Sequence, residues 1–348
     1  MIVKRPVPNC MFIGVFALFS VAAAFLAAPS ETYAAACNIS ITACGCTITA
    51  GFGATTPYTI ANDLTFVSIS GACIEIAASN VALTGGTHTI TGPGSGTPTV
   101  GLHIDASTKS VLLVSINATG FGVGVKLDGR LAALSSSSAN MNGRGVVVNG
   151  PVALLDVVTT TGNSQAGVQV NSTANGATLD RVTAISNTGP GIKLLGVTGA
   201  NVIDSIATGN STFGIWLNGA SDNTIEFFTA ADNAIAGAYL GCHAAGPTGA
   251  ACSPGTLPAN ANTLSGDIVG GTFSNVSATS PTKQRFGVAI DAGNFRNRVL
   301  NVKGTGNGTL DAIDENSNCA SNMWIGTTSF GTKSPSPSPS GNFFCMTI

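Results

Sequence analysis

Charged and aromatic side chains are scarce in this sequence of 348 residues. Asp, Glu, Lys and Arg together make up 9% of the residues, Phe, Trp and Tyr make up 6%, and the formal net charge is −2. The chain therefore has no basic stripe of the kind that binds nucleic acid, and we expect no nucleic-acid partner.

Amphipathic helical stretches are also lacking. The sequence has 44 glycines and is rich in Ala, Ser, Thr, Val and Asn, and Gly, Thr, Asn and Val rank low in helix propensity. This composition favours short strands joined by many tight turns. The length allows two average domains or one elongated all-β domain.

The first 36 residues have the pattern of a secretory signal peptide. Lys4 and Arg5 precede an almost wholly apolar stretch at 11–28, and small residues at 34–36 suit cleavage after Ala36. We therefore predict a secreted or periplasmic protein that is not held in the membrane after cleavage. The alternative is an uncleaved anchor, because the apolar stretch approaches membrane-spanning length.

Removing residues 1–36 leaves eight cysteines, and an even number in an exported chain favours disulfides. Cys242–Cys252 and Cys319–Cys345 are the natural local pairs. The N-terminal four allow three connectivities, among which the sequence does not choose: they are Cys37, Cys44, Cys46 and Cys73. Zinc is the alternative, but the sequence has no Cys-x-x-Cys pair to support it.

A repeat of about 23 residues is the strongest pattern in the chain. A glycine followed by apolar-x-apolar recurs at positions 101, 124, 145, 167, 191, 214, 237 and 287. Apolar–acidic steps and turn asparagines recur in phase with it. Each unit holds strands of only three to five residues, so each is best explained as one coil of a parallel β-solenoid.

The last step of the repeat, from Gly237 to Gly287, spans 50 residues. The turn asparagine that matches Asn223 is then Asn262, which leaves one ordinary coil and two insertions, near 241–261 and 276–286. We predict an N-terminal cap at 37–70 and a β-helix of about ten coils at 71–318. A C-terminal cap at 319–348 contains a Ser/Pro-rich loop.

The stretch GIWLNGASDNTIEFFTAADNAIAGAYL (214–240) resembles the repeat of pectate-lyase-like proteins and of the periplasmic sugar-hydrolase and copper-maturation β-helix group. Residues 71–104 resemble the first coils of secreted members. The resemblance covers about 60–348 and implies a right-handed parallel β-helix. It says little about activity, because this repeat occurs in lyases, hydrolases and epimerases. Three scattered histidines argue against copper handling.

The variable residue between the two apolar positions of each repeat points to solvent, because side chains alternate along a strand. This column contains Gln169, Lys193, Trp216 and Tyr239. Two neighbouring aromatic rings beside a lysine and a glutamine suit a sugar ring, so we predict a carbohydrate-binding site here. The alternative is that the rings only stabilise adjacent strands or lie under the loop at 241–261.

A second column contains the acidic residues Asp156, Asp180, Asp204 and Glu226. Stacked carboxylates repel one another and need water, cations or basic neighbours. We predict Ca²⁺ as a possible ligand between Asp180 and Asp204. The alternative is a solvated acidic edge that discourages lateral strand pairing.

Three functions follow from these patterns. The first is an exported monomeric β-helix protein that contacts polysaccharide through an exposed strand face. The second is a polysaccharide lyase or epimerase acting on an acidic glycan, and the third is a structural or adhesive solenoid. Whether the chain is an enzyme stays open, but a galacturonase-type hydrolase is disfavoured, because its Asn-Thr-Asp, Gly-Asp-Asp, Gly-His-Gly and Arg-Ile-Lys motifs are missing.

Overall fold

The computed structural model describes residues 35–51, 53–247, 259, 262–265, 284–316, 319, 322–325 and 333–335. All of them belong to one compact unit, Ala34–Ile348. In the part described, the chain makes about 11 turns of an all-β solenoid and contains no α-helix. The predicted fold class is confirmed.

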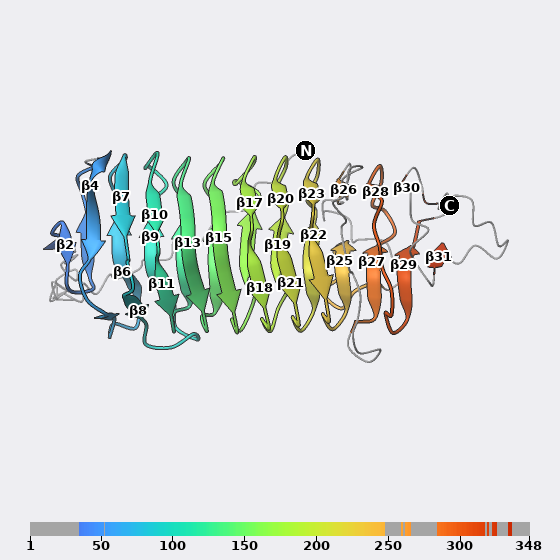
Figure 1. Cartoon of the computed structure of the whole chain (residues 1–348), viewed down its shortest axis with the longest axis horizontal. Coiled ribbons are helices and arrows are strands. Elements are labelled where there is room, and N and C mark those ends of the chain that lie inside the picture. Colours follow the sequence, from blue (N-terminus) through green and yellow to red (C-terminus); the bar gives the residue numbers. More distant parts are fainter. Residues whose placement is uncertain are drawn as a thin grey trace, which may run out of the picture. The chain divides into compact units, whose positions relative to one another are not determined.

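One face of the solenoid is a parallel sheet, here called sheet A, in which the described residues supply 13 strands. Figure 1 shows successive coils side by side along one axis. In spatial order its strands are β1 (Ala35–Ala36), β3 (Cys46–Ile48), β6 (Gly71–Ile76), β9 (Thr99–Ile104), β12 (Val123–Leu127), β14 (Arg144–Val148), β16 (Val168–Asn171), β19 (Ile192–Leu195), β22 (Phe213–Asn218), β25 (Ala236–Leu240), β27 (Phe286–Ile290), β29 (Leu310–Asp314) and β31 (Lys333–Pro335).

The other faces form a bent sheet, here called sheet B, with 18 strands among the described residues. They are β2 (Ser40–Ile41), β4 (Gly53–Ile60), β5 (Leu64–Thr65), β7 (Val81–Thr84), β8 (Thr89–Thr91), β10 (Leu112–Val114), β11 (Asn117–Thr119), β13 (Ala133–Asn140), β15 (Leu154–Thr161), β17 (Thr178–Asp180), β18 (Thr183–Ile185), β20 (Asn201–Ile203), β21 (Ile206–Thr208), β23 (Thr224–Glu226), β24 (Thr229–Ala231), β26 (Thr263–Ser265), β28 (Arg298–Leu300) and β30 (Met323–Ile325).

A single residue per coil makes the bend in sheet B. In β13 and β15, which run across the bend, this residue is Ser136 or Val157, and its φ is positive. In the next coils the bend falls at Arg181 and Asp204, which also have positive φ and end β17 and β20. The left-handed conformation turns the strand sharply, so each coil gains a corner without a loop.

The core is a column of apolar side chains inside the coils. Ile104, Leu127 and Val148 stack in register along sheet A and are fully buried. Leu155 and Leu179 do the same along sheet B. Each coil covers the apolar layer of the next, which is why the repeat cannot be stable as a single unit.

Turn asparagines form a buried ladder that links the coils. The backbone N–H of Asn163 donates to Asn187 Oδ1 at 3.0 Å, that of Asn187 to Asn210 Oδ1 at 3.0 Å, and that of Asn210 to Asn233 Oδ1 at 3.1 Å. Buried backbone groups at a turn need such partners. The repeated asparagines are therefore structural.

The coil interrupted by the step of 50 residues resumes where the repeat predicts. Asn223 donates to Asn262 Oδ1, and Thr224 pairs with Thr263 in register. Ala238 pairs with Val288, which aligns Gly237 with Gly287. Most of the two insertions, and the Ser/Pro-rich loop, lie outside the described residues.

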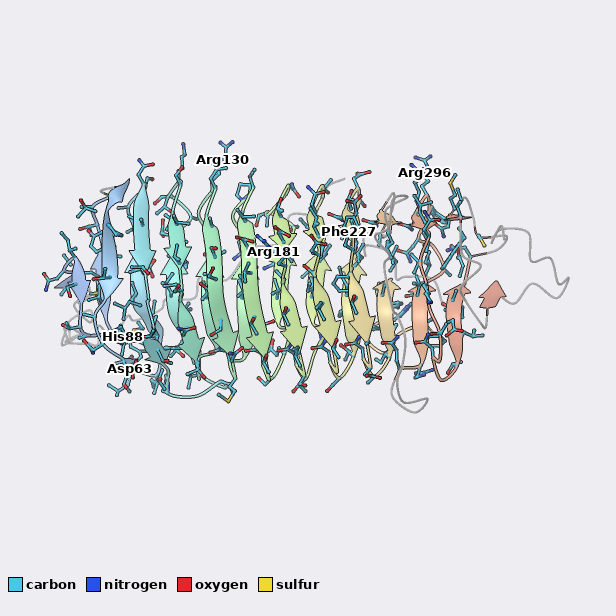
Figure 2. All side chains as sticks on the ribbon, viewed as in Figure 1. Asp63, His88, Arg130, Arg181, Phe227 and Arg296 are labelled. Carbon is cyan, nitrogen blue, oxygen red and sulfur yellow. A yellow bond between two sulfur atoms is a disulfide. The ribbon has the colours of Figure 1, made fainter. Side chains whose placement is uncertain are left out.

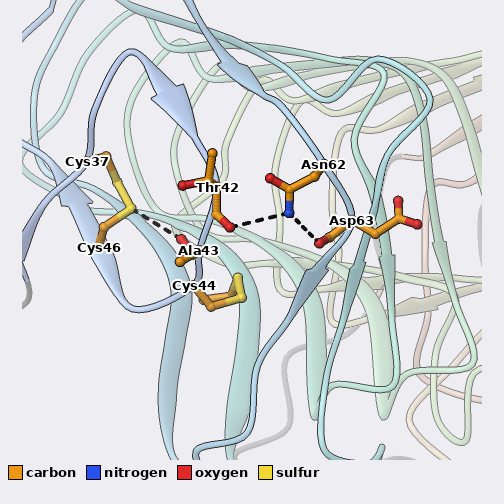
Figure 3. Close-up of a disulfide and its surroundings, with 8 residues drawn as sticks. Cys37, Thr42, Ala43, Cys44, Cys46, Asn62 and Asp63 are labelled. Carbon is orange, nitrogen blue, oxygen red and sulfur yellow. Dashed lines mark hydrogen bonds between the residues drawn. A yellow bond between two sulfur atoms is a disulfide. The ribbon is translucent and has the colours of Figure 1, made fainter.

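Two disulfides join the first coils. Cys37 bonds Cys46 and Cys44 bonds Cys73, which settles the pairing that the sequence left open. Close to them, the Asn62 side chain donates to the carbonyls of Thr42 and Asp63 (Figure 3). The bridges tie the strands β3 and β6 at the N-terminal end of the solenoid, as expected for a disulfide-bearing cap.

For the other two predicted disulfides, the structure describes only one cysteine of each pair. Cys242 and Cys319 are each disulfide-bonded, but Cys252 and Cys345 lie outside the described residues, so both pairings stay predictions.

The predicted leader lies outside the described residues except for Ala35 and Ala36, which form β1. Among the described residues, which do not include 1–34, there is no helix whose length and apolar character would let it cross a membrane.

Candidate functional site

The outward column of sheet A has the register that the repeat predicts. Lys126 pairs with His103 and Val147, Gln169 with Lys193, and Trp216 with both Lys193 and Tyr239. The four predicted binding residues therefore do lie on consecutive coils of one strand face.

The predicted exposed aromatic platform is wrong. Trp216 is only 7% exposed and Tyr239 is fully buried. The Phe213 ring stacks on Tyr239 at 4.6 Å, and the Lys193 ammonium lies 4.5 Å above the Trp216 ring. Phe213, Trp216 and Tyr239 form a second apolar cluster outside the coils, together with Phe286.

The chain that leaves the coil after β25 closes over the two rings. The Trp216 indole donates to the carbonyl of Gly241 at 2.7 Å, and the Tyr239 hydroxyl bonds Asp291. Burial and the adjacent Asp291 carboxylate raise the pKa of Tyr239 far above its ordinary value. Because both rings are buried, no flat aromatic surface is left for a sugar.

Gln169 and Lys193 stay partly exposed on the same face. Gln169 donates to Asn171, which donates to Asn149, which in turn donates to Asp128. This chain of amides forms a polar strip along the outer edge of sheet A. The part of the predicted site that lies N-terminal to Trp216 is therefore open and hydrophilic.

A groove of about 480 Å³ lies on this open part of sheet A. It is lined by Ser95, Gly96, Thr97, Pro98, Thr99, Val100, Gly122, Val123, Lys126, Arg144, Ser164 and Gln165. One wall is the turn before β9, which rests on glycines of the next coils: a Cβ on Gly122 would lie 1.9 Å from the Thr97 carbonyl oxygen. Small residues at this point let the loop approach the sheet.

Two cations on this face lack an acidic partner. Within the described part of the chain, no carboxylate lies within ion-pair distance of Arg144 or Lys193. Arg144 Nε donates to Gln165 Oε1 at 2.9 Å. Burial, and then the positive charge of Arg144, lower the pKa of Lys193. An anion placed between them would relieve both effects.

A fully paired charge cluster adjoins the groove. His103 lies between Glu75, at 2.9 Å, and Asp128, at 2.8 Å, and Lys126 contacts Asp128 at 2.7 Å. Burial alone would lower the pKa of His103, but hydrogen bonds to Asp128 and Glu75 outweigh it and raise the pKa to about 9. His103 is therefore an imidazolium at neutral pH.

The same contacts act on Asp128 in the opposite direction. Burial opposes its ionisation, but hydrogen bonds from His103, Lys126 and Asn149 hold the pKa of Asp128 far below its ordinary value. The positive charges of His103 and Lys126 are thus matched by the carboxylates of Glu75 and Asp128, and the cluster offers no unpaired charge to a ligand.

The predicted acidic column is corrected at Asp204. Asp156 and Asp180 pair in register, but the residue opposite Asp180 is Ile203. Leu179 and Val202 both point into the core and set this register, so Asp204 falls one position later, at the bend. The pattern of acidic residues in the sequence places Asp204 opposite Asp180, but it does not take into account that the inward-pointing Val202 sets the register.

Arg181 supplies a positive charge to two acids of this column, next to the place proposed for a cation. Its guanidinium contacts Asp156 and lies 3.4 Å from Asp180. Figure 2 shows the position of Arg181 on the solenoid. These contacts raise the pKa of Arg181, the hydrogen bond to Asp156 most of all. Calcium between Asp180 and Asp204 stays a prediction, and Arg181 is its built-in competitor.

Sequence reasoning overlooked Arg144 and Gln165. Arg144 lies immediately before the anchor glycine, in a column that otherwise holds apolar or small residues such as Val123 and Ala166. A charged residue at this position in a single coil is the feature of the sequence that could have identified Arg144. Its position beside the groove becomes clear only from the structure, in which the loop at 94–98 forms one wall of the groove.

The family model for the right handed beta helix region matches residues 121–318. The chain belongs to this family. The predicted resemblance is confirmed, and the match covers more than half of the β-helix described above. No curated protein matches the sequence.

Solved structures of similar β-helix proteins are distant. A periplasmic alginate epimerase has 11% identity and a TM-score of 0.45 over 70% of this chain and 62% of its own. The mannuronan C-5 epimerase A-module of Azotobacter vinelandii has 13% identity and a TM-score of 0.41 over 84% and 90%. DFA-IIIase from Arthrobacter chlorophenolicus A6 has 11% identity and a TM-score of 0.48 over 80% and 70%. The chain thus spans less than two thirds of the epimerase first named.

Proposed function

We propose that this β-helix protein binds an acidic polysaccharide along the open part of sheet A, between β9 and β19. The observation that carries the proposal is the pair Arg144 and Lys193, two cations on one face with no carboxylate partner in the described structure. They belong to a chain whose net charge is negative, so their positive potential is local and not a general property of the surface.

The groove supplies the remaining contacts that a sugar acid needs. Gln165 and Ser164 offer hydrogen-bond groups beside Arg144, and Gln169 extends the polar surface toward Lys193. Arg binds carboxylates in a bidentate way, and Lys acts as a point charge. Successive coils lie about 4.8 Å apart, and Arg144 on β14 and Lys193 on β19 are two coils apart. A polymer with regularly spaced carboxylates therefore presents one acid to each cation.

The test is a binding titration with a polyuronate, and with a neutral glucan for comparison. We expect Arg144→Ala/Lys193→Ala to lose at least tenfold in affinity for the polyuronate. Binding should weaken as ionic strength rises, because exposed charges are screened. The matched control is Arg130→Ala/Arg298→Ala, which removes two exposed arginines that do not line the groove.

Two results contradict the proposal. One is equal loss of binding in both double variants, which indicates attraction by overall charge. The other is unchanged binding in Arg144→Ala/Lys193→Ala.

A lyase or epimerase activity is the second candidate, and the lowered pKa of Lys193 is what favours it. Proton abstraction next to a uronate carboxylate needs a base that is neutral near pH 7, and a lysine gains that form when its pKa falls. His103 does not serve as this base, because it is protonated at neutral pH. Incubation with polyuronates should then produce unsaturated or epimerised sugars, and Lys193→Met should abolish them. Binding without any product supports the first function alone.

A further inference from the structure

A second group of chemically active side chains lies beyond the groove, where the chain leaves the coil after β25. Cys242, His243 and Asp291 each place one potential metal-ligand atom here, and the three atoms lie within 4.8 Å of one another. His243 Nδ1 is 2.7 Å from Asp291 Oδ2 and 3.6 Å from Cys242 Sγ. None of these residues lines the groove.

Asp291 points to a ligand by an independent observation. Its side chain is fully buried directly after β27, and Oδ2 receives the Tyr239 hydroxyl and His243 Nδ1. The other oxygen, Oδ1, is buried and has no hydrogen-bond partner among the residues that the structure describes. A buried carboxylate oxygen without a donor costs free energy, so native proteins usually provide such a partner.

Cys242 is disulfide-bonded, so it has no thiolate to offer a metal in this state. Its partner lies outside the described residues. The only ligands ready in the disulfide form are thus His243 and Asp291, which is one short of the three that an open zinc site has.

We propose that Cys242, His243 and Asp291 form a zinc site that becomes competent when the Cys242 disulfide is reduced. Zinc bonds to sulfur and nitrogen of about 2.3 and 2.05 Å at tetrahedral angles place the two atoms about 3.6 Å apart. Cys242 Sγ and His243 Nδ1 already have that separation. Asp291 Oδ1 supplies the third bond, Tyr239 holds Oδ2 in place, and water takes the fourth position.

The chemistry balances with a dithiol as reductant. The dithiol transfers two electrons and two protons to the Cys242 disulfide, which yields two protein thiols and one oxidised dithiol. Zn²⁺ then replaces the proton of the Cys242 thiol. His243 binds through Nδ1 in the tautomer that carries its proton on Nε2, so its hydrogen bond to Asp291 gives way to the shared metal.

Cobalt titration of the full chain tests the site, because Co²⁺ bound to a thiolate shows a charge-transfer band. The protein is reduced with a phosphine, which does not itself offer a thiolate to the metal, and circular dichroism checks the fold. We expect the band only after reduction, with one Co²⁺ per chain displaced by Zn²⁺. Cys242→Ser should abolish it, and Asp291→Asn should weaken metal affinity at least tenfold.

His88→Ala is the matched control, because His88 also lies beside a carboxylate, Asp63, at 3.6 Å (Figure 2), but among the described residues this pair belongs to no cluster of three potential metal ligands. It should leave the titration unchanged. If reduction disturbs the fold, Cys252→Ser frees Cys242 without reductant, provided that thiol mapping shows Cys242 free.

Three outcomes overturn the proposal. The first is a folded protein with a free Cys242 thiol and no charge-transfer band. The second is a band of equal strength in Cys242→Ser, and the third is equal metal binding in the disulfide form.

Discussion

The two halves of sheet A have the same repeat but opposite outer faces. From β9 to β19 the outward residues are charged or polar and half-exposed, except the buried Val147 of β14, and they lie next to an open groove. From β22 to β27 the same column holds Trp216, Tyr239 and Ala289, all buried in the second apolar cluster. The strands and their register do not differ between the halves.

What differs is the chain outside the coils. In the first half a short turn at 94–98 leans on Gly122 and leaves a groove beside it. In the second half the chain after Leu240 crosses the strand face, where Gly241 and Asp291 take up the polar atoms of the two rings. An outward position in a solenoid is therefore a binding surface only where no insertion covers it.

The largest effect should come from truncating the covered half. Trp216→Ala removes a buried ring from the second apolar cluster, and we expect a loss of about 3–5 kcal/mol in the free energy of unfolding. Polyuronate binding by the folded variant should change much less than in Arg144→Ala/Lys193→Ala, because Lys193 loses the ring beneath it but keeps its charge. Denaturant unfolding and the titration above measure both quantities. A stable variant that no longer binds the polyuronate contradicts this expectation. It indicates that Trp216 belongs to the binding surface, and that the two halves do not differ in this respect.

The charged cluster of the open half should make stability depend on pH. The folded-state pKa of His103 is about 9, above its ordinary value of 6.5. The stabilisation is therefore complete below about pH 6.5 and lost as pH rises through about 9, with a magnitude of about 3 kcal/mol. The difference in unfolding free energy between wild type and His103→Gln should shrink over this range. A difference that stays constant rules out the proposed protonation.

The wall of the groove can be changed without touching its charges. In Gly122→Ala the new Cβ meets the Thr97 carbonyl oxygen at 1.9 Å, so the loop must move, at a cost of about 1–3 kcal/mol. We expect weaker polyuronate binding. Gly96→Ala is the matched control, because nothing lies within 4 Å of its added Cβ. Equal binding in both variants means that the wall does not contribute.

The smallest effect should be at Arg181, which is exposed on sheet B. Arg181→Ala should hardly change stability, because exposed ion pairs contribute little. It does leave Asp156 and Asp180 without their cation. We expect added Ca²⁺ to raise the melting temperature of the variant slightly and that of the wild type less. An equal shift in both proteins indicates that Arg181 does not compete with calcium.

Much of the fold follows from the sequence because a solenoid repeats one local solution. The apolar pair and the turn asparagine recur in each coil, so their spacing located Asn262 as the residue that bonds Asn223 across the first insertion. The acidic column failed at Asp204 because the register follows the inward residue Val202 and not the charge beside it. Of the four residues predicted to contact sugar, Gln169 and Lys193 are partly exposed, whereas Trp216 and Tyr239 are buried.

The sequence by itself determined the parallel β-helix, the register of sheet A and the outward direction of the variable column, because all three follow from periodicity along the chain. The tertiary structure decided which of those outward residues face solvent and how Cys37, Cys44, Cys46 and Cys73 pair. The physical reason is that exposure depends on segments distant in sequence. The chain at Gly241 buries Trp216, and the turn at Thr97 stands beside Arg144 and leaves it open.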